Sequence, residues 1–136
     1  MKEDMNIRPN IPPPKPAPAL QPARRLWTAQ DLLLMDQAGI LHPDERVELI
    51  AGEVYHLAPK GIRHEVLRNE LVLYWADRRP KDVKFAEEPP LRLDDHNEPQ
   101  PDIILFPADL RVHEVRGDSV LLVVVSAGDK IPQWSN

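Results

Sequence analysis

The sequence contains no cysteine, and this absence removes two kinds of site. Without thiols the chain can form neither disulfides nor thiolate metal centres, so any bound metal needs oxygen or imidazole ligands. With only five glycines, the chain also has no glycine-rich loop that could cradle a phosphate with backbone N–H groups. The HExxH and GxSxG patterns are missing as well. Together these absences exclude the commonest enzyme classes.

Long apolar runs are also missing from the sequence. No run approaches the roughly 20 residues that are needed to cross a bilayer. The charged, proline-rich amino terminus lacks the apolar segment of a secretion signal. Combined with the lack of cysteine, these features predict a soluble protein of the reducing cytoplasm.

The formal net charge of -5 is unevenly distributed along the chain. Residues 1–25 carry five basic and two acidic side chains, a balance of +3, and the remainder carries 12 bases against 20 acids, a balance of -8. Contacts from Lys and Arg to phosphates supply most non-specific affinity for nucleic acid, so an acidic body binds nucleic acid poorly. A nuclease with this composition would depend on metal ions or on a local basic patch.

Proline dominates the amino-terminal segment, where residues 9–22 hold seven of the 16 prolines. Fixed φ angles and missing N–H donors favour an extended polyproline-like chain there. We therefore predict a disordered arm over residues 1–25, followed by one domain over residues 26–136. The arm could be a PxxP-type ligand for a partner domain, a basic tether, or a mere extension.

Two helices and one hairpin are predicted from local patterns. Thr28 is placed as an N-cap with Asp31 three residues later, and Gly39 closes this first helix. Apolar residues alternate with polar ones on both sides of Ala51-Gly52, which predicts two strands joined by a tight turn. Apolar residues at three- and four-residue steps between positions 66 and 75 predict a longer helix, which Pro80 ends.

The remaining segments predict strands, and with the helices they indicate an α/β fold. The strand candidates are "VKFAEE", "LRL", "DIILF" and "SVLLVVVS". The last two are apolar at nearly every position, which suits central strands that are covered on both faces. The order of helices and strands therefore favours an α/β sandwich over an open antiparallel sheet.

Asp102 is the main candidate for chemistry, because it stands at the start of the apolar run in "EPQPDIILF". A Mg²⁺ site needs only one or two protein carboxylates plus a substrate phosphate, and a bound cation would offset the lost hydration of a buried acid. The alternative is that Asp102 lies beyond the buried part of the strand or bonds to backbone N–H groups that follow Pro101.

Two further residues are weaker candidates. Glu48 in "RVELI" points to the face opposite its apolar neighbours, where it could be a metal or water ligand or simply the solvated side of a hairpin. His64, near the start of the long helix, could be a base, a phosphate contact or an ordinary surface residue. Glu87 and Glu88 are interpreted as solvent-facing or strand-end charges.

Six segments in this order resemble the Uma-two restriction endonuclease family of the PD-(D/E)XK nuclease superfamily. They are "WTAQDLL", "RVELIAGEVYHLAP", "RHEVLRNELV", "EEPPLRL", "QPDIILF" and "SVLLVVVS". The resemblance runs from about Trp27 to about Ser126. The family's "PD" maps onto Pro101-Asp102, and the histidine that follows its hairpin maps onto His64.

The resemblance implies a restriction-endonuclease-like mixed sheet flanked by helices, incomplete at the carboxyl terminus. It implies an endonuclease that hydrolyses DNA phosphodiester bonds with Mg²⁺, or with Mn²⁺, and it allows a homodimer. Asp102 is then the expected metal ligand, and Asp102, Glu48 and His64 are the expected catalytic residues. In this superfamily a lysine or a substitute orients or activates the attacking water.

The sequence departs from the family after the predicted strand that begins at Ser119. Family members continue with a strand resembling "LLVVEVSDSS", whereas this chain reads "LLVVVSAGDKIPQWSN". Val125 stands where the second metal-binding glutamate is expected, or that glutamate is deleted. Lys130 does not follow a strand acid by two residues, so it does not replace the family's lysine.

The missing acid predicts a weak or inactive nuclease, because the cation must be fixed at the phosphate to stabilise the transition state. The chain is then either a shortened, inactive member or the product of a reading-frame change near Val124. The alternative function is a non-enzymatic interaction protein that acts through its proline-rich arm.

Overall fold

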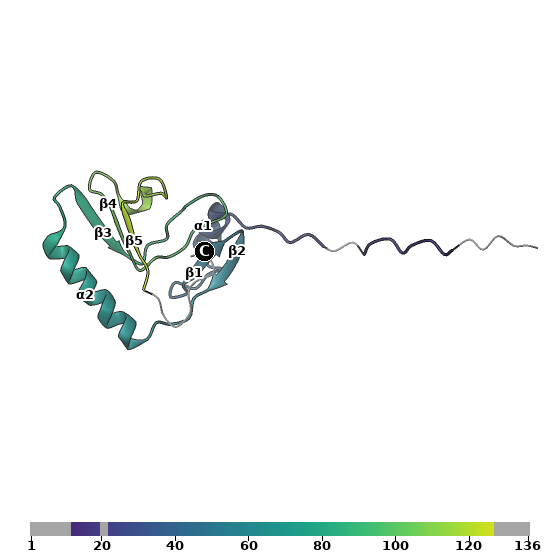
Figure 1. Ribbon diagram of the computed structural model, residues 1–136, viewed down its shortest axis with the longest axis horizontal. Coiled ribbons are helices and arrows are strands. Elements are labelled where there is room, and N and C mark those ends of the chain that lie inside the picture. Colours follow the sequence, from purple (N-terminus) through teal and green to yellow (C-terminus); the bar gives the residue numbers. More distant parts are fainter. Residues whose placement is uncertain (1–11, 20–21, 127–136) are drawn as a thin grey trace, which may run out of the picture.

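The computed structural model describes residues 12–19 and 22–126, in which two α-helices accompany two small β-sheets. Helix α2 flanks the three-stranded sheet, and α1 lies beside the two-stranded sheet at the other end of the domain (Figure 1). The predicted α/β class is confirmed. Within the described residues both sheets are antiparallel.

Helix α1 (Ala29–Gln37) begins at the predicted cap. The backbone N–H of Asp31 donates to Thr28 Oγ1 over 3.1 Å, and the backbone N–H of Thr28 donates to Asp31 Oδ2 over 2.9 Å. This reciprocal pair satisfies two N–H groups that lack partners at a helix start. The helix ends just before Gly39, whose φ of 72° only glycine adopts without strain.

Strands β1 (Val47–Ile50) and β2 (Glu53–His56) form the predicted hairpin. Ala51 and Gly52 join them with φ angles of 50° and 76°, as a type I′ turn requires. A side chain at Gly52 would also collide with Leu26, since its Cβ would lie 2.8 Å from the Leu26 Cβ. The turn is therefore specific for glycine at its second position and strained at Ala51.

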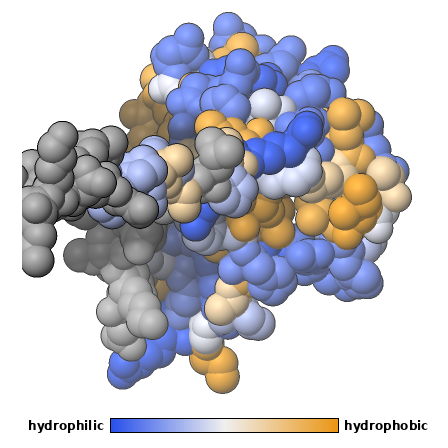
Figure 2. All heavy atoms as spheres, turned by 90° about the vertical axis from the view of Figure 1, so that its right-hand side faces the viewer, coloured by the Kyte–Doolittle hydropathy of each residue, from blue (hydrophilic) through white to orange (hydrophobic). Residues whose placement is uncertain are grey.

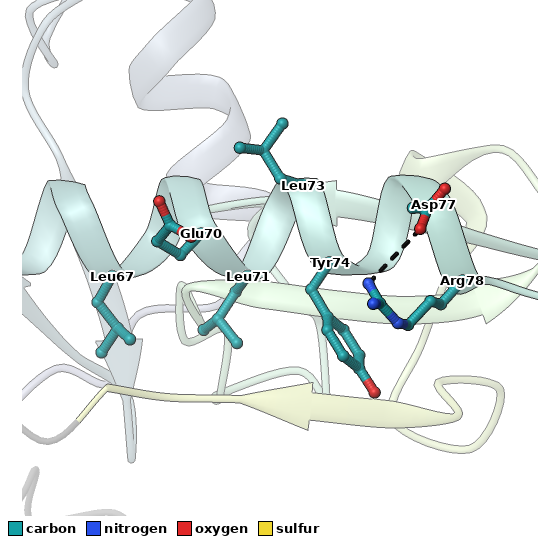
Figure 3. Close-up of a pocket in the computed structure, with 7 residues that line it drawn as sticks. All are labelled: Leu67, Glu70, Leu71, Leu73, Tyr74, Asp77 and Arg78. Carbon is teal, nitrogen blue, oxygen red and sulfur yellow. Dashed lines mark ion pairs between the residues drawn. The ribbon is translucent and has the colours of Figure 1, made fainter.

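Helix α2 (Ile62–Arg78) matches the predicted long helix and stops two residues before Pro80. It contains no fully buried residue. A hollow of about 440 Å³ runs along α2, and Figure 3 shows Leu67, Leu71 and Tyr74 pointing to one side of the helix there. Figure 3 also marks the 3.6 Å ion pair between Asp77 and Arg78. No sequence-predicted site residue lines this hollow.

Strands β3 (Val83–Glu87), β4 (Ile103–Pro107) and β5 (Leu122–Val124) form the second sheet in the order β3-β4-β5. Residues 103–106 of β4 are all buried, which confirms the prediction that "DIILF" is a central strand. The same prediction for "SVLLVVVS" is wrong. Strand β5 is an edge strand of the described sheet, and its Leu122 and Val123 are exposed because no described element covers them.

The predicted strand "LRL" is absent from the described structure. Arg92 makes only an isolated bridge to Arg116. Pro89 and Pro90 precede this segment, and prolines cannot donate to a strand ladder. A turn from Asp94 to Asn97 follows directly, so the segment is too short to pair.

Two buried clusters form the core, one at each end of the domain. The first contains Ala29, Leu32, Val47 and Leu49, and the second contains Leu91, Ile104, Phe106 and Val115. Leu49 and Glu98 exchange backbone hydrogen bonds of 2.8 and 3.2 Å, and this bridge joins the hairpin to the segment that leads into β4. The hairpin thereby fixes the approach to Asp102.

The surface mixes polar side chains with apolar patches, as the orange areas among the blue in Figure 2 show. No helix among the described residues is long and apolar enough to cross a membrane. Residues 12–19 of the predicted arm are exposed and have neither helix nor strand. The rest of that prediction rests partly on residues 1–11 and 20–21, which lie outside the described residues, as do Lys130 and the segment 127–136.

The turn strain at Ala51 predicts that Ala51→Gly stabilises the domain by about 0.5–1 kcal/mol. Left-handed backbone costs an L-residue roughly 1–2 kcal/mol, and the larger entropy loss of glycine offsets part of the gain. The hydrogen bond from the residue 51 N–H to Asn97 Oδ1 is kept. Urea unfolding measures the change, with Gly52→Ala as the matched variant that should destabilise. A lower unfolding free energy for Ala51→Gly would contradict this account of the turn.

Candidate functional site

Asp102 immediately precedes β4 and is 5% exposed. Its backbone N–H donates to the carbonyl of Val124 over 3.1 Å, and its carbonyl accepts from the N–H of Glu88 over 2.9 Å. These two bonds hold Asp102 between β3 and β5 at the end of the sheet. Its carboxylate therefore starts a buried strand, as the sequence predicts.

Both carboxylate oxygens of Asp102 have polar partners from distant parts of the chain. Lys60 Nζ and His64 Nε2 approach Oδ1, the second at 3.2 Å. Ser126 donates to Oδ2 from its backbone N–H over 2.5 Å and from its hydroxyl over 2.8 Å. Asp102 therefore bonds to a backbone N–H 24 residues away and to charged groups, rather than to the backbone just after Pro101.

Glu88 supplies a second carboxylate at the same place. It follows β3 with a φ of 49°, a strained value for a residue other than glycine. Its Oε1 lies 3.1 Å from both Lys60 Nζ and Arg68 Nη1, and 3.6 Å from Arg46 Nη2. Glu88 does stand at a strand end, as predicted, but its side chain is only 20% exposed and faces other charges.

The two acids are held in their charged forms. Burial raises the pKa of Asp102, but the hydrogen bonds from Lys60 and Ser126 outweigh it and hold that pKa below its usual value. Burial likewise raises the pKa of Glu88, but the hydrogen bond from Lys60 and the charges of Lys60, Arg46 and Arg68 outweigh it and hold that pKa below its usual value. Both residues are therefore carboxylates at neutral pH, which is the form that binds cations.

The donor set fits a divalent cation. His64, Glu88 and Asp102 each offer one ligand atom, and these atoms lie within 4.8 Å of one another. His64 Nε2 is buried and makes no hydrogen bond, and Glu88 Oε1 is buried among its ion-pair partners. Two carboxylates and an imidazole suit Mg²⁺ or Mn²⁺. Since the Lys60 ammonium lies against both acids, a cation here would have to displace it from Asp102.

The structure does not bring Glu48 into this cluster. Glu48 is buried on β1, so it is not the solvated side of the hairpin. Its Oε1 accepts a 2.8 Å hydrogen bond from the backbone N–H of Gln100, two residues before Asp102. The structure therefore brings His64 into contact with Asp102. Glu48 instead contacts the segment that leads to Asp102.

Sequence reasoning missed Lys60, Glu88 and Ser126 as parts of the cluster. Lys60 lies two residues before α2 and His64 lies in its first turn, so both are near the same end of the helix. Ser126 follows β5, whose antiparallel partner β4 starts just after Asp102, so strand pairing brings the two together. Glu88 carried no signal apart from its place at the end of a predicted strand.

The family comparison bears on this cluster directly. The family model described as "Uma2: Putative restriction endonuclease" matches residues 29–125, which include Glu48, Glu88 and Asp102. The chain belongs to the Uma2 family. A search of curated proteins found no match to the chain. Membership in Uma2 confirms the resemblance seen in the sequence and agrees with a restriction-endonuclease-like fold.

The family resemblance leads us to expect a second metal-binding glutamate at Val125, and the structure shows which side chains lie there instead. Val125 is 37% exposed, and the side chain from this end of β5 that reaches Asp102 belongs to Ser126. The second carboxylate in the cluster comes instead from Glu88, beyond the other neighbouring strand. The cluster therefore contains two acids, although β5 contributes none of them.

The lowered pKa values predict a loss of stability in acid. A carboxyl group whose pKa is lower in the folded chain stabilises it above the unfolded pKa of about 4, and that stability is lost as pH falls through the folded pKa. The unfolding free energy should therefore fall between about pH 5 and pH 3. Urea unfolding at several pH values measures this slope.

Asp102→Asn is the control for this pH dependence, because it keeps the shape of the side chain and removes its titration. Its unfolding free energy should change less with pH than that of the wild type. Equal slopes for the two proteins would mean that Asp102 is not held charged by its partners.

Proposed function

We propose that this Uma2 domain is a metal-dependent endonuclease that hydrolyses DNA phosphodiester bonds with low activity. The observation that carries the proposal is the group of three ligand atoms from His64, Glu88 and Asp102, with the Lys60 ammonium against both acids. One buried and one half-buried acid, a lysine and an imidazole nitrogen without a hydrogen bond form the kind of site that phosphoryl chemistry needs.

Asp102, with Glu88 and His64, would hold Mg²⁺ or Mn²⁺ in this site. The bound cation would stabilise the charge that develops on the phosphate and on the leaving oxygen. The backbone bonds of Asp102 to Val124 and Glu88 fix the position of its carboxylate. The strained φ of Glu88 supports the same role, since such strain persists where the surrounding structure demands one side-chain position.

Lys60 is proposed as the lysine that orients the attacking water. Its ammonium has three donors and no acceptor, so once it leaves Asp102 it can donate to a water beside the phosphate. Its ion pair with Glu88 keeps it at the site after that release. Lys60 is thus proposed for the role of the family's lysine, which the spacing of Lys130 in the sequence does not fit.

Arg46 and Arg68 provide the local basic patch that an acidic nuclease requires. Both side chains form ion pairs with Glu88 and are 27% and 22% exposed, so their guanidinium groups keep some surface beside the acids. Guanidinium groups bind phosphate oxygens in a fixed, often bidentate geometry. These two side chains would therefore hold the DNA backbone beside the acids in spite of the net charge of -5.

Low activity follows from the same charges. Lys60, Arg46 and Arg68 already neutralise the two acids, so a cation must compete with them for the carboxylates. The Uma2 glutamate expected on the strand beside Asp102 is also absent. Both features weaken metal binding, and a poorly fixed cation stabilises the transition state less.

Glu48 acts in this proposal as a positioning residue. Its hydrogen bond to the N–H of Gln100 fixes the segment that enters β4 at Asp102. Its burial on β1 couples the hairpin to that segment. Glu48 therefore helps to position Asp102 through Gln100 and does not touch the substrate.

Asp102→Ala should lower cleavage of supercoiled plasmid DNA in Mn²⁺ or Mg²⁺ by about 100-fold or more, since it removes the central ligand. Gel analysis of nicked and linear products measures the rate. Asp109→Ala is the matched control, because Asp109 is an exposed acid on the loop after β4 and should have no effect. Wild-type rates from Asp102→Ala would refute the role of Asp102.

Lys60→Met should strengthen Mn²⁺ binding about tenfold and still lower DNA cleavage. Removal of one cation within contact distance of both acids favours the metal, and loss of the donor leaves the water poorly oriented. Calorimetric Mn²⁺ titration and the plasmid assay measure the two effects. Lys81→Met, at an exposed lysine, is the control. Weaker Mn²⁺ binding by Lys60→Met would contradict the competition between ammonium and metal.

A further inference from the structure

The hydroxyl of Ser126 stands between two residues of the cluster. Its Oγ lies 2.8 Å from Asp102 Oδ2 and 2.5 Å from His64 Nδ1. A serine hydroxyl has a single proton, so it can donate to one of these atoms only. The other atom must be a donor or face an unfavourable contact between two acceptors.

When His64 is neutral, only one of two proton arrangements keeps acceptors from facing each other at Ser126. The carboxylate of Asp102 is an acceptor without a proton to give, so a Ser126 hydroxyl that donated to His64 would turn its lone pairs toward Oδ2. If the hydroxyl donates to Asp102 instead, its oxygen can accept a hydrogen bond from His64 Nδ1–H. The second arrangement leaves no acceptors facing each other around Ser126.

This arrangement determines what His64 presents on its other side. A neutral imidazole with its proton on Nδ1 carries a lone pair on Nε2. Nε2 is buried, makes no hydrogen bond, and lies 3.2 Å from Asp102 Oδ1. The lone pair therefore points among carboxylate oxygens, where a cation is the favourable partner.

The position of Ser126 is itself fixed by the sheet. Its backbone N–H donates to Asp102 Oδ2 over 2.5 Å, and Val124, two residues earlier, accepts from the N–H of Asp102. These two backbone hydrogen bonds hold Ser126 against Asp102, so its hydroxyl has a fixed position next to His64. A histidine that binds a metal through one nitrogen commonly has its other N–H held in this way.

We propose that Ser126 is a positioning residue that fixes His64 as the Nδ1–H tautomer and so presents Nε2 as a ligand for a divalent cation. The inference deepens the proposed nuclease function and rests on the same cluster. It assigns Nε2 as the ligand atom of His64. It also gives Ser126, which reaches Asp102 from the end of β5, a role in the site.

The tautomer of His64 can be measured without metal or DNA. In the full chain labelled with ¹⁵N-histidine, long-range proton–nitrogen spectra at pH 8.5 distinguish the Nδ1–H tautomer, the Nε2–H tautomer and the imidazolium. His64→Gln identifies the signals of His64. The wild type should show Nδ1–H, and an Nε2–H or imidazolium pattern in the wild type would overturn the proposal.

Variants of Ser126 test the cause of that tautomer. Ser126→Ala should shift His64 to Nε2–H, since Nε2 can then donate to Asp102 Oδ1 and Nδ1 has lost its acceptor. Ser126→Thr keeps a hydroxyl and should retain Nδ1–H, which separates the hydroxyl's effect from general disturbance of β5. An unchanged Nδ1–H pattern in Ser126→Ala would overturn the role of Ser126.

Mn²⁺ binding separates this proposal from the nuclease function. Ser126→Ala should bind Mn²⁺ about tenfold more weakly than the wild type, and Ser126→Thr should restore most of that affinity. Equal Mn²⁺ affinity for wild type and Ser126→Ala would overturn the inference even if the protein cleaves DNA. Mn²⁺ binding that is tight in the wild type and weaker in Ser126→Ala, without DNA cleavage, would instead contradict the nuclease function and support the role of Ser126.

Discussion

The burial of the Asp102 charge is the constraint on which the site depends. A carboxylate that is 5% exposed loses its hydration, and only charged partners and hydrogen bonds can offset that loss. Those partners come from the start of α2, through Lys60 and His64, and from the end of β5, through Ser126. Among the described residues, neither buried hydrophobic cluster contains a residue of α2 or β5, so the ionic contacts join segments that these clusters do not connect. Anything that removes the charge of Asp102 therefore alters both the site and the way these segments meet.

The charge balance of the site bears on how an acidic domain could approach DNA. Arg46, Lys60 and Arg68 surround Glu88, and Arg68 also forms ion pairs with Glu65 and Glu87. With Asp102, four acids face three bases, so the bases largely neutralise the negative charge of the site within a chain of net charge -5. The same bases oppose a metal ion at the carboxylates, so contact with phosphate and binding of the cation compete. The proposed low activity would be the physical consequence of that opposition.

Local rules allowed several elements to be predicted from the sequence. The reciprocal bonds of Thr28 and Asp31 depend on residues three apart, and the hairpin depends on the two residues of its turn. Asp102 could be identified because a lone acid at the start of an apolar run is unusual. His64 was a candidate from its place near the start of the long helix, the family resemblance supported it, and the structure places it beside Asp102.

The missed features all depend on contacts between distant segments. Lys60 meets Asp102 across 42 residues, and no local pattern encodes that pairing. The role of Glu88 follows from the bend after β3, where a positive φ turns its side chain toward Lys60. The exposure of β5 depends on which elements lie beside it in space, which the apolar composition of "SVLLVVVS" does not reveal. Glu48 was placed on the face opposite its apolar neighbours, and only the fold shows that it is buried and bonds to Gln100.

Anomalous diffraction from crystals soaked in Mn²⁺ tests the central claim most directly, because it locates the metal independently of activity. The account predicts one strong anomalous peak at coordination distance from Asp102, with Glu88 and His64 Nε2 as neighbours and the Lys60 ammonium moved away from Asp102. Saturating Mn²⁺ that leaves Lys60 in contact with Asp102 and produces no peak there would contradict it.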